Sequence, residues 1–535
     1  MIIKSLIIEN FKGIGEPVRV EFKPITLLYG PNSAGKSTIV QALHYAREVL
    51  DRNNLDADIT QQGGDFVDLG GFRNFVHGHE IERKVRICFE LNLANAVIPT
   101  YHNIALDNII DGQGQGPIPE CDLSYLVKNA AIGLTIAWSA QFKRPYVSEY
   151  RTWINNEEFA CITADPDGKW IKISEINFLN SLFVIEQDAY GTDMPSTPLL
   201  DLYNLAFPNK FNGNYSQVDL PLYGQNQAIP KWGRELLIGQ EKSITEARDM
   251  EVENLSLLQL SAILSQLVTG PGELLCNELR KFRYLGPIRE IPPRNYEAPR
   301  FHEHARWSNG LAAWDVLNNS DEDFVEKISN WMDERLNTGY RVVQRRYREI
   351  EYGSRLHSML VMGNVIDEDE DILRRAYEEI PEQKHLVLKT NGKLDVMPQD
   401  VGIGISQVLP VVVAALADNN TLVAIEQPEL HIHPRLQTEL ADVFIEAALG
   451  GQNNSFVLET HSEHLILRLL KRIRQTADNE LPEGSSPVTA EDVGVLYVQP
   501  GNNGSEVISI PITEDGEFGR PWPEGFFAER AKELY

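Results

Sequence analysis

Two glycines five positions apart, followed at once by lysine and serine, constrain this chain more than any other feature. Such a loop can turn its backbone N–H groups inward around phosphates, while the lysine adds positive charge and the serine hydroxyl can bind Mg²⁺. The residues expected to form this phosphate-binding loop are Gly30, Asn32, Ser33, Ala34, Gly35, Lys36, Ser37 and Thr38.

Both flanks of the loop fit a strand followed by a helix. Residues 25–29 form a short apolar run, which predicts a buried strand. From residue 37 to residue 50 the apolar side chains recur at helical spacing. A chance glycine-rich turn would not need these flanks, so the sequence favours a true phosphate loop.

Composition and charge describe a large acidic protein. The 535 residues are 42% hydrophobic, which suffices for two or three domains. With 49 Lys and Arg against 77 Asp and Glu, the net charge of −28 argues against a nucleic-acid surface over the whole molecule. Two local basic runs, residues 345–348 and 471–474, are interpreted as solvated helix faces.

Cysteine usage and hydropathy indicate a cytoplasmic location. The four cysteines are scattered without a C-x-x-C pair, so neither a disulfide framework nor a zinc knuckle is predicted. The N-terminus resembles a strand rather than a secretory leader, and no apolar run approaches the ~18 residues of a membrane span.

The pattern along the chain predicts an α/β fold with a mostly parallel sheet, split by insertions. The first half of the head covers residues 1–95 and its second half covers residues 385–510. Between them we expect a β-rich insertion at 96–230 and a helical one at 231–384, and a tail follows at 511–535. Within the β-rich insertion, residues 150–162 predict a hairpin that turns at Asn155 and Asn156.

Two later strands end in groups suited to a nucleotide site. The apolar run 421–425 ends in Glu426, a candidate Mg²⁺ ligand, and the run 456–458 leads to His461, which could reach a γ-phosphate or its attacking water. Because the carboxyl ends of parallel strands meet at one edge of a sheet, these side chains should lie beside the phosphate loop.

The spacing of these groups resembles that of the ABC-type ATPases of the SMC, RecF and OLD group. Lys36 and Glu426 lie 390 positions apart, and Gln407, Glu426 and His461 follow one another within 54 positions. In that group a large insertion parts the two halves of the ATP site. The resemblance implies ATP and Mg²⁺ as cofactors.

In the same group a glycine- and serine-rich signature turn touches the ATP of the opposite subunit. The resemblance assigns this contact to Gly404, Ser406 and Gln407, and it implies an ATP-dependent head-to-tail dimer or higher oligomer. The order Gly402-x-Gly404-x-Ser406-Gln407 departs from the usual Ser-Gly-Gly-Gln. A dinucleotide-binding G-x-G-x-x-G is the weaker alternative, since its third glycine is missing.

A narrower likeness covers nearly the whole chain. It is similar to prokaryotic AAA/OLD-like ATPases that end in a short domain of unknown function, such as the PtuA family of Septu and retron-linked Septu modules. That resemblance implies anti-phage defence, an HNH-type effector nuclease as partner and, in retron modules, a reverse transcriptase with its nucleic acid. The segments that carry the likeness are 10–13, 67–72, 284–289, 426–431 and 522–527.

One departure bears on mechanism. Many relatives carry a catalytic glutamate directly after the metal-binding acid, where this chain has Gln427. A glutamine can position water but cannot accept its proton, so hydrolysis should be slow unless Glu429 or His461 serves instead. Two alternatives stay open: a DNA-repair or chromosome-maintenance ATPase of the same fold, and a scaffold that binds ATP without hydrolysing it.

Overall fold

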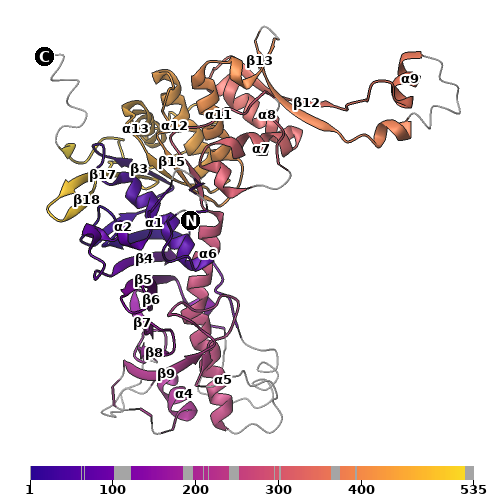
Figure 1. The fold of residues 1–535 in the computed structure, drawn as a ribbon. Helices are drawn as coiled ribbons and strands as arrows, with labels where there is room; N and C mark the ends of the chain where they lie inside the picture. The colour runs from indigo at the N-terminus through magenta and orange to yellow at the C-terminus, as the bar shows by residue number, and fades with distance from the viewer. Residues whose placement is uncertain are drawn as a thin grey trace.

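A computed structural model of the chain shows three β-sheets with helices packed on them (Figure 1). The structure describes residues 2–523 apart from the following gaps: 59, 62, 65–66, 102–121, 185–196, 209, 212, 215, 240–251, 295, 300–302, 363–373 and 392–393. Residues 524–535 lie outside the described part, so the second half of the predicted tail and most of the 522–527 motif are not covered.

A six-stranded, mostly parallel sheet forms the centre of the head and confirms the predicted α/β class. Its strands, in spatial order, are β11 (Arg283–Leu285), β15 (Leu422–Glu426), β16 (Ser455–Glu459), β3 (Ile25–Tyr29), β17 (Val493–Gly501) and β18 (Gly504–Ser509). Only β18 pairs antiparallel to its neighbour. The strand that precedes the phosphate loop therefore lies between strands drawn from the last hundred residues of the chain.

Helices cover both faces of this sheet, which explains why its central strands β15, β16 and β3 are almost wholly buried. In β3, Leu28 packs into the core that contains α1 (Lys36–Arg52). Leu27 and Tyr29 point to the opposite face and pack into a second core. That second core includes side chains of α11 (Ile403–Leu416), α12 (Pro434–Leu449) and α13 (Glu463–Ala477).

A nine-stranded antiparallel sheet extends from the head (Figure 1). In spatial order it contains β10 (Leu237–Ile238), β9 (Gln217–Tyr223), β8 (Ile171–Ile176), β7 (Glu157–Ala164), β6 (Arg144–Ile154), β5 (Asn129–Ser139), β4 (Val85–Asn92), β1 (Ile3–Glu9) and β2 (Val18–Glu21). Because β4 pairs with β5 along its whole length, the boundary expected at residue 95 does not separate two sheets.

The predicted hairpin within this sheet is confirmed. Strands β6 and β7 pair antiparallel, and Asn155 and Asn156 connect them with φ angles of 50° and 68°. Both residues thus have the left-handed backbone that a two-residue hairpin turn requires.

A long helix packs near this sheet: α5 (Val252–Leu264) continues through the π-helical turn η4 (Ser265–Thr269) into α6 (Gly270–Lys281).

A third, small sheet projects from the head as an arm (Figure 1). Its strands are β12 (Tyr340–Tyr347), β13 (Gln383–Thr390) and β14 (Asp395–Val396), with α9 (Arg355–Met362) at the far end. The basic run 345–348 belongs mostly to β12, so the helix face predicted for it is wrong. Arg345 pairs with Asp395 of β14, and Arg346 lies 3.0 Å from Glu322.

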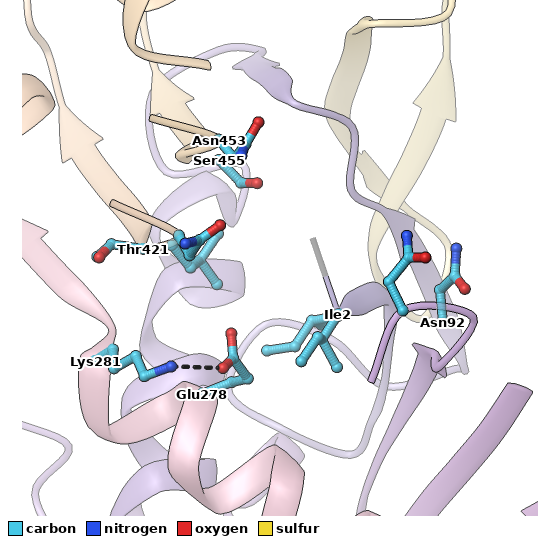
Figure 2. Close-up of a pocket in the computed structure, with 11 residues that line it drawn as sticks. Ile2, Asn92, Glu278, Lys281, Thr421, Asn453 and Ser455 are labelled. Atoms are coloured by element: carbon cyan, nitrogen blue, oxygen red, sulfur yellow. Dashed lines mark hydrogen bonds and ion pairs between the residues drawn. The ribbon is translucent and has the colours of Figure 1, made fainter. Parts of the chain in front are cut away.

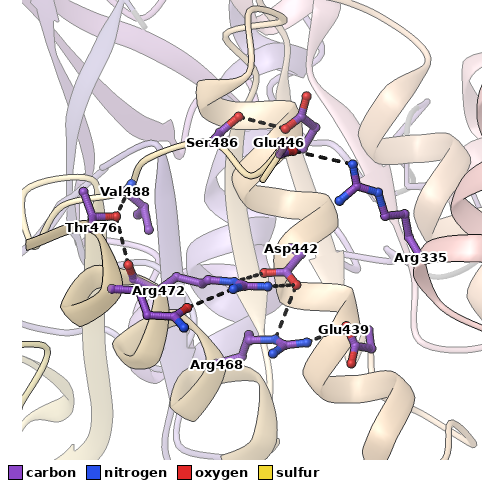
Figure 3. Close-up of polar contacts among 11 residues, drawn as sticks. Arg335, Glu439, Asp442, Glu446, Arg468, Arg472, Thr476, Ser486 and Val488 are labelled. Carbon is purple, nitrogen blue, oxygen red and sulfur yellow. Dashed lines mark hydrogen bonds and ion pairs between the residues drawn. The ribbon is translucent and has the colours of Figure 1, made fainter. Parts of the chain in front are cut away.

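The second basic run lies on α13, and one of its residues, Arg472, forms an ion pair with α12 (Figure 3). Arg472 is 8% exposed and donates two hydrogen bonds of 2.8 Å to Asp442. Arg468 contacts the same carboxylate at 3.4 Å and also pairs with Glu439. These bonds fix α12 relative to α13, the two helices that follow β15 and β16.

In the described part of the chain, no helix is long and apolar enough to cross a membrane.

Candidate nucleotide site

The phosphate loop lies between β3 and α1, as the sequence predicts. Gly30, Ser33 and Gly35 have φ angles of 142°, 62° and 104°, in or near the region that favours glycine. A Cβ atom at Gly30 would collide with the carbonyl of Val498, and one at Gly35 would collide with the Ser505 hydroxyl. Both glycines are therefore needed to form the loop against β17 and β18.

The two side chains at the start of α1 point toward the sheet edge. Lys36 is 4% exposed, and its Nζ donates to the carbonyls of Gly30 at 3.1 Å and Pro31 at 3.0 Å. Ser37 donates a 2.7 Å hydrogen bond from Oγ to Oε2 of Glu459. The loop cation and the loop hydroxyl therefore meet an acid that closes β16, since Lys36 Nζ also lies 3.8 Å from Glu459 Oε1.

Glu426 and Glu459 form a carboxylate pair at this edge. They are register partners at the ends of the parallel strands β15 and β16. The sequence identified Glu426 but assigned no role to Glu459. The signal was present, because Glu459 ends an apolar run in the same manner as Glu426.

Burial and like charge both act on this pair. Burial first, and then the negative charge of Glu459, raise the pKa of Glu426 to about 7. Burial likewise raises the pKa of Glu459, against the opposing effects of Ser37 and Lys36. Burial also lowers the pKa of Lys36. A cation bound between the carboxylates would relieve their repulsion.

The turn after β15 contains the other predicted catalytic residues. Gln427 has a left-handed backbone with φ 46°, and its N–H donates to the carbonyl of Glu459 at 2.7 Å. Glu429 accepts hydrogen bonds from the Thr460 hydroxyl at 2.8 Å and from the His461 backbone N–H at 2.7 Å. Burial and the Lys36 charge lower the pKa of His461, which favours the neutral imidazole.

The signature segment begins α11, but its predicted contact residues differ in accessibility. Ser406 is fully buried, and its Oγ donates to the carbonyl of Pro398 at 3.1 Å. Gln407 is 4% exposed and Gly404 is half-buried. In this conformation Ser406 and Gln407 cannot touch a neighbouring subunit. Gly402 and Ile403 form the exposed start of the helix instead.

Sequence reasoning also gave no role to two residues of the segment that follows α6. The Tyr284 hydroxyl donates to Oε1 of Glu426 at 3.0 Å. The Arg289 guanidinium donates from Nη2 to the carbonyls of Glu426 at 2.9 Å and Gln427 at 3.1 Å. The sequence shows this segment only as part of a family likeness, because contacts across 137 positions leave no local pattern in the sequence.

The residues at this edge fit the phosphates and Mg²⁺ of a nucleotide. A hydroxyl and carboxylates are the oxygen ligands that Mg²⁺ prefers, and it usually binds one or two carboxylates plus phosphate oxygens. Ser37, Glu426 and Glu459 supply these groups. The loop backbone and Lys36 supply the cradle for the phosphates. Mg²⁺ would neutralise charge on the phosphates when bound.

A separate cleft lies at the other end of the same strands (Figure 2). Its volume is about 620 Å³, and Thr421, Leu422 and Ser455 line it at the starts of β15 and β16. Glu278 and Lys281 of α6, which form an ion pair at 3.0 Å, lie on another side. This cleft is therefore distinct from the nucleotide site at Glu426 and Glu459.

Fold and site together define the class of this protein as a P-loop ATPase. Residues 1–184 match the family model "AAA ATPase domain", and residues 289–468 match "AAA domain, putative AbiEii toxin, Type IV TA system". The first match contains the phosphate loop and the second contains both carboxylates. The two matches therefore support the same class, an AAA-type ATPase.

Other comparisons give further likenesses. Residues 488–535 match the model "Protein of unknown function (DUF3696)". The SMC head domain from Thermotoga maritima is similar at 8% identity and a TM-score of 0.36, covering 96% of this chain and 100% of that chain. The Smc head domain derived from Pyrococcus furiosus, with an extended coiled coil and bound to the C-terminal domain of ScpA, is similar at 11% identity and a TM-score of 0.35. That match covers 99% of this chain and 98% of that chain. No curated protein sequence matches significantly.

Proposed function

We propose that this chain binds ATP with Mg²⁺, hydrolyses it slowly, and acts as the sensor or regulatory subunit of a prokaryotic anti-phage defence complex. One observation carries the ATPase part of this proposal: Lys36, Ser37, Glu426 and Glu459 converge at the carboxyl edge of one parallel sheet. The loop would hold the phosphates, and the hydroxyl and carboxylates would hold the metal ion.

Slow turnover follows from the groups available to take a proton from water. Gln427 cannot serve as a base. The carboxylate of Glu429 accepts hydrogen bonds from Thr460 and His461, which favour a positioning role for it. Burial lowers the pKa of His461 and favours its neutral form, which can accept a proton or orient the attacking water.

Assembly through ATP is the next part of the proposal. The start of α11 carries the exposed Gly402 and Ile403, with Ile403 54% exposed. A helix N-terminus attracts anions, and this one lies directly after the signature glycine. We expect it to face the γ-phosphate held by a second copy, which gives the head-to-tail dimer that the family likeness implies.

The defence role rests on sequence likeness. One matching family is described as a putative toxin of a type IV toxin–antitoxin system, and a family of unknown function matches the C-terminal segment. The PtuA-type likeness adds an HNH-type effector nuclease, with a retron reverse transcriptase and its nucleic acid as further partners. DNA-repair chemistry finds less support, because Arg345 and Arg346 of the basic run pair with carboxylates of this chain.

A plaque assay tests the defence role. Cells that carry the chain with its neighbouring genes should resist phage, and Lys36→Ala should abolish the resistance at equal protein level. Purified chain alone should not cut DNA. Resistance that survives Lys36→Ala, or metal-dependent cleavage by the isolated chain, would contradict the proposal.

A further inference from the structure

The segment from β11 to Arg289 contacts the turn after β15 in two ways. Tyr284 bonds the side chain of Glu426, whereas Arg289 bonds the main-chain carbonyls of Glu426 and Gln427. The orientation of the metal-binding carboxylate and the left-handed backbone of Gln427 therefore both depend on one short segment. A guanidinium that bridges two successive carbonyls restricts the peptide between them.

Arg289 is an unusual residue to find at this depth. It is 2% exposed, and its Nε and Nη1 have no hydrogen-bond partner within the described part of the chain. Burying a cation with unused donors costs free energy that the surrounding structure must offset. The two carbonyl bonds and the negative charge of Glu429 offset this cost, and all three groups belong to the turn after β15.

The backbone of Arg289 is tied to α11. Gln407 donates a 2.7 Å hydrogen bond from Nε2 to the carbonyl of Arg289, and this bond is buried. Gly310, at the start of α7 (Leu311–Asn319), packs against the Arg289 side chain, since a Cβ there would lie 3.1 Å from Cβ of Arg289. Gln407 lies one helical turn beyond Ile403, the exposed residue at the start of α11.

We infer that Arg289 is a positioning residue that couples the start of α11 to the Glu426–Gln427 turn. A second copy of this chain that presses on Ile403 would move the first turn of α11. Gln407 would pass the movement to the Arg289 backbone, and the guanidinium would pass it to the two carbonyls. Contact between copies would thus adjust the catalytic turn of the contacted subunit. This inference rests on the proposed ATPase function.

The test compares Arg289→Lys and Gln407→Met with the parent. A lysine keeps the charge but cannot bridge two carbonyls in the same geometry, and a methionine keeps the volume of Gln407 without its donor. Arg294→Lys is the matched control, because Arg294 is exposed and pairs with Asp400 on the surface. The readouts are ATP affinity without metal, the Mg²⁺ concentration that gives half-maximal ATP binding, and kcat at several protein concentrations.

For Arg289→Lys, metal-free ATP affinity should stay within about twofold of the parent, because the phosphate loop is untouched. The Mg²⁺ requirement should rise, and kcat should fall by about tenfold or more, as small displacements of catalytic groups do. Because contact between copies adjusts the catalytic turn, kcat of the parent should change with protein concentration. Gln407→Met should remove that change. The double variant should be no slower than Arg289→Lys, since both changes interrupt one pathway.

Contrary results separate the inference from the function on which it rests. An Arg289→Lys variant with the Mg²⁺ requirement and kcat of the parent would refute the inference alone, as would additive effects in the double variant. If Arg289→Lys fails to fold by circular dichroism, Gln407→Met decides, and retained concentration dependence refutes the coupling. If the parent binds ATP without turnover, the Mg²⁺ titration alone tests the inference, and an unchanged Mg²⁺ requirement in Arg289→Lys refutes it. A parent that does not bind ATP refutes the proposed function and the inference with it.

Discussion

Ser37 donates a 2.7 Å hydrogen bond to Glu459, a residue 422 positions further along the chain. The bond joins the first turn of α1 to the end of β16, and it exists because β3 pairs in parallel with β16. The two halves of the nucleotide site, which the sequence separates widely, are thereby brought to one edge. Glu459 is the acid nearest to the loop hydroxyl and cation among the described contacts.

Glu459→Gln should weaken Mg²⁺-dependent ATP binding at least as strongly as Glu426→Gln. The amide removes one negative charge that faces the metal and weakens the acceptor for Ser37. Equilibrium binding of a fluorescent ATP analogue, with and without Mg²⁺, measures the effect. Glu506→Gln, which changes an acid on β18 outside the carboxylate pair, is the control. Unchanged Mg²⁺ dependence in Glu459→Gln would remove this residue from the metal site.

Ile403→Arg should weaken ATP-dependent dimers, because the charge would stand on the exposed start of α11. Ser406→Arg is a poor test, since it would force a cation into the packed side of the helix and destabilise the fold. Leu467→Arg controls for a charge at another exposed apolar position. Light scattering with and without ATP gives the mass. Dimers that withstand Ile403→Arg would place the contact elsewhere.

His44 should make the parent sensitive to acid. It is buried against Phe282 and Tyr284, neither ring nitrogen has a hydrogen-bond partner within the described chain, and burial with the Arg47 charge lowers its pKa to about 3. In the unfolded chain the pKa of histidine is about 6.5, so between these values the unfolded state binds more protons. The stabilisation is therefore complete above pH 6.5 and is lost as pH falls toward 3.

His44→Phe should remove the part of this pH dependence that His44 causes. Between pH 7 and pH 5, the protonation of His44 in the unfolded chain should lower the parent's free energy of unfolding by about 2 kcal/mol. Urea unfolding of both proteins at pH 5 and pH 7 measures the difference, with the exposed His79 replaced by asparagine as the control. An equal loss of stability in parent and His44→Phe would show that His44 is already charged in the folded state.

The sequence predicted local features well and pairings across the chain poorly. The loop from Gly30 to Thr38 and the hairpin turn at Asn155 and Asn156 are set by residues next to one another, so motif and turn chemistry suffice. Glu459, in contrast, acquires its role only when β16 lies beside β3. Arg289 acquires its role only when it meets carbonyls 137 and 138 positions away.

Helix rotation and strand propensity explain the remaining differences. Periodicity places Ser406 on α11 but does not say which side of that very apolar helix faces the core, and the structure buries it. The run at Arg345 and Arg346 looked helical because charged residues are poor strand formers. Tertiary pairing of β12 with β13, together with the ion pair between Arg345 and Asp395 of β14, overrides that preference.

Gln427→Glu should raise steady-state hydrolysis if chemistry limits the rate. The change supplies a proton acceptor beside the attacking water, and general-base catalysis contributes typically ~10²–10⁴-fold. Single-turnover phosphate release isolates the chemical step. Gln217→Glu, which alters an exposed glutamine at the start of β9, is the control. Unchanged single-turnover rates would indicate that His461 or Glu429 already accepts the proton.

The central claim is that the loop beginning at Gly30 holds the phosphates of ATP, and calorimetry of Lys36→Ala tests it most directly. Lys36 supplies the side-chain cation of the loop, so its removal should abolish or greatly weaken ATP binding. Far-UV circular dichroism and the thermal midpoint should stay near those of the parent. Loss of binding by a folded Lys36→Ala variant is the predicted result, and equal ATP affinity in variant and parent would contradict the account.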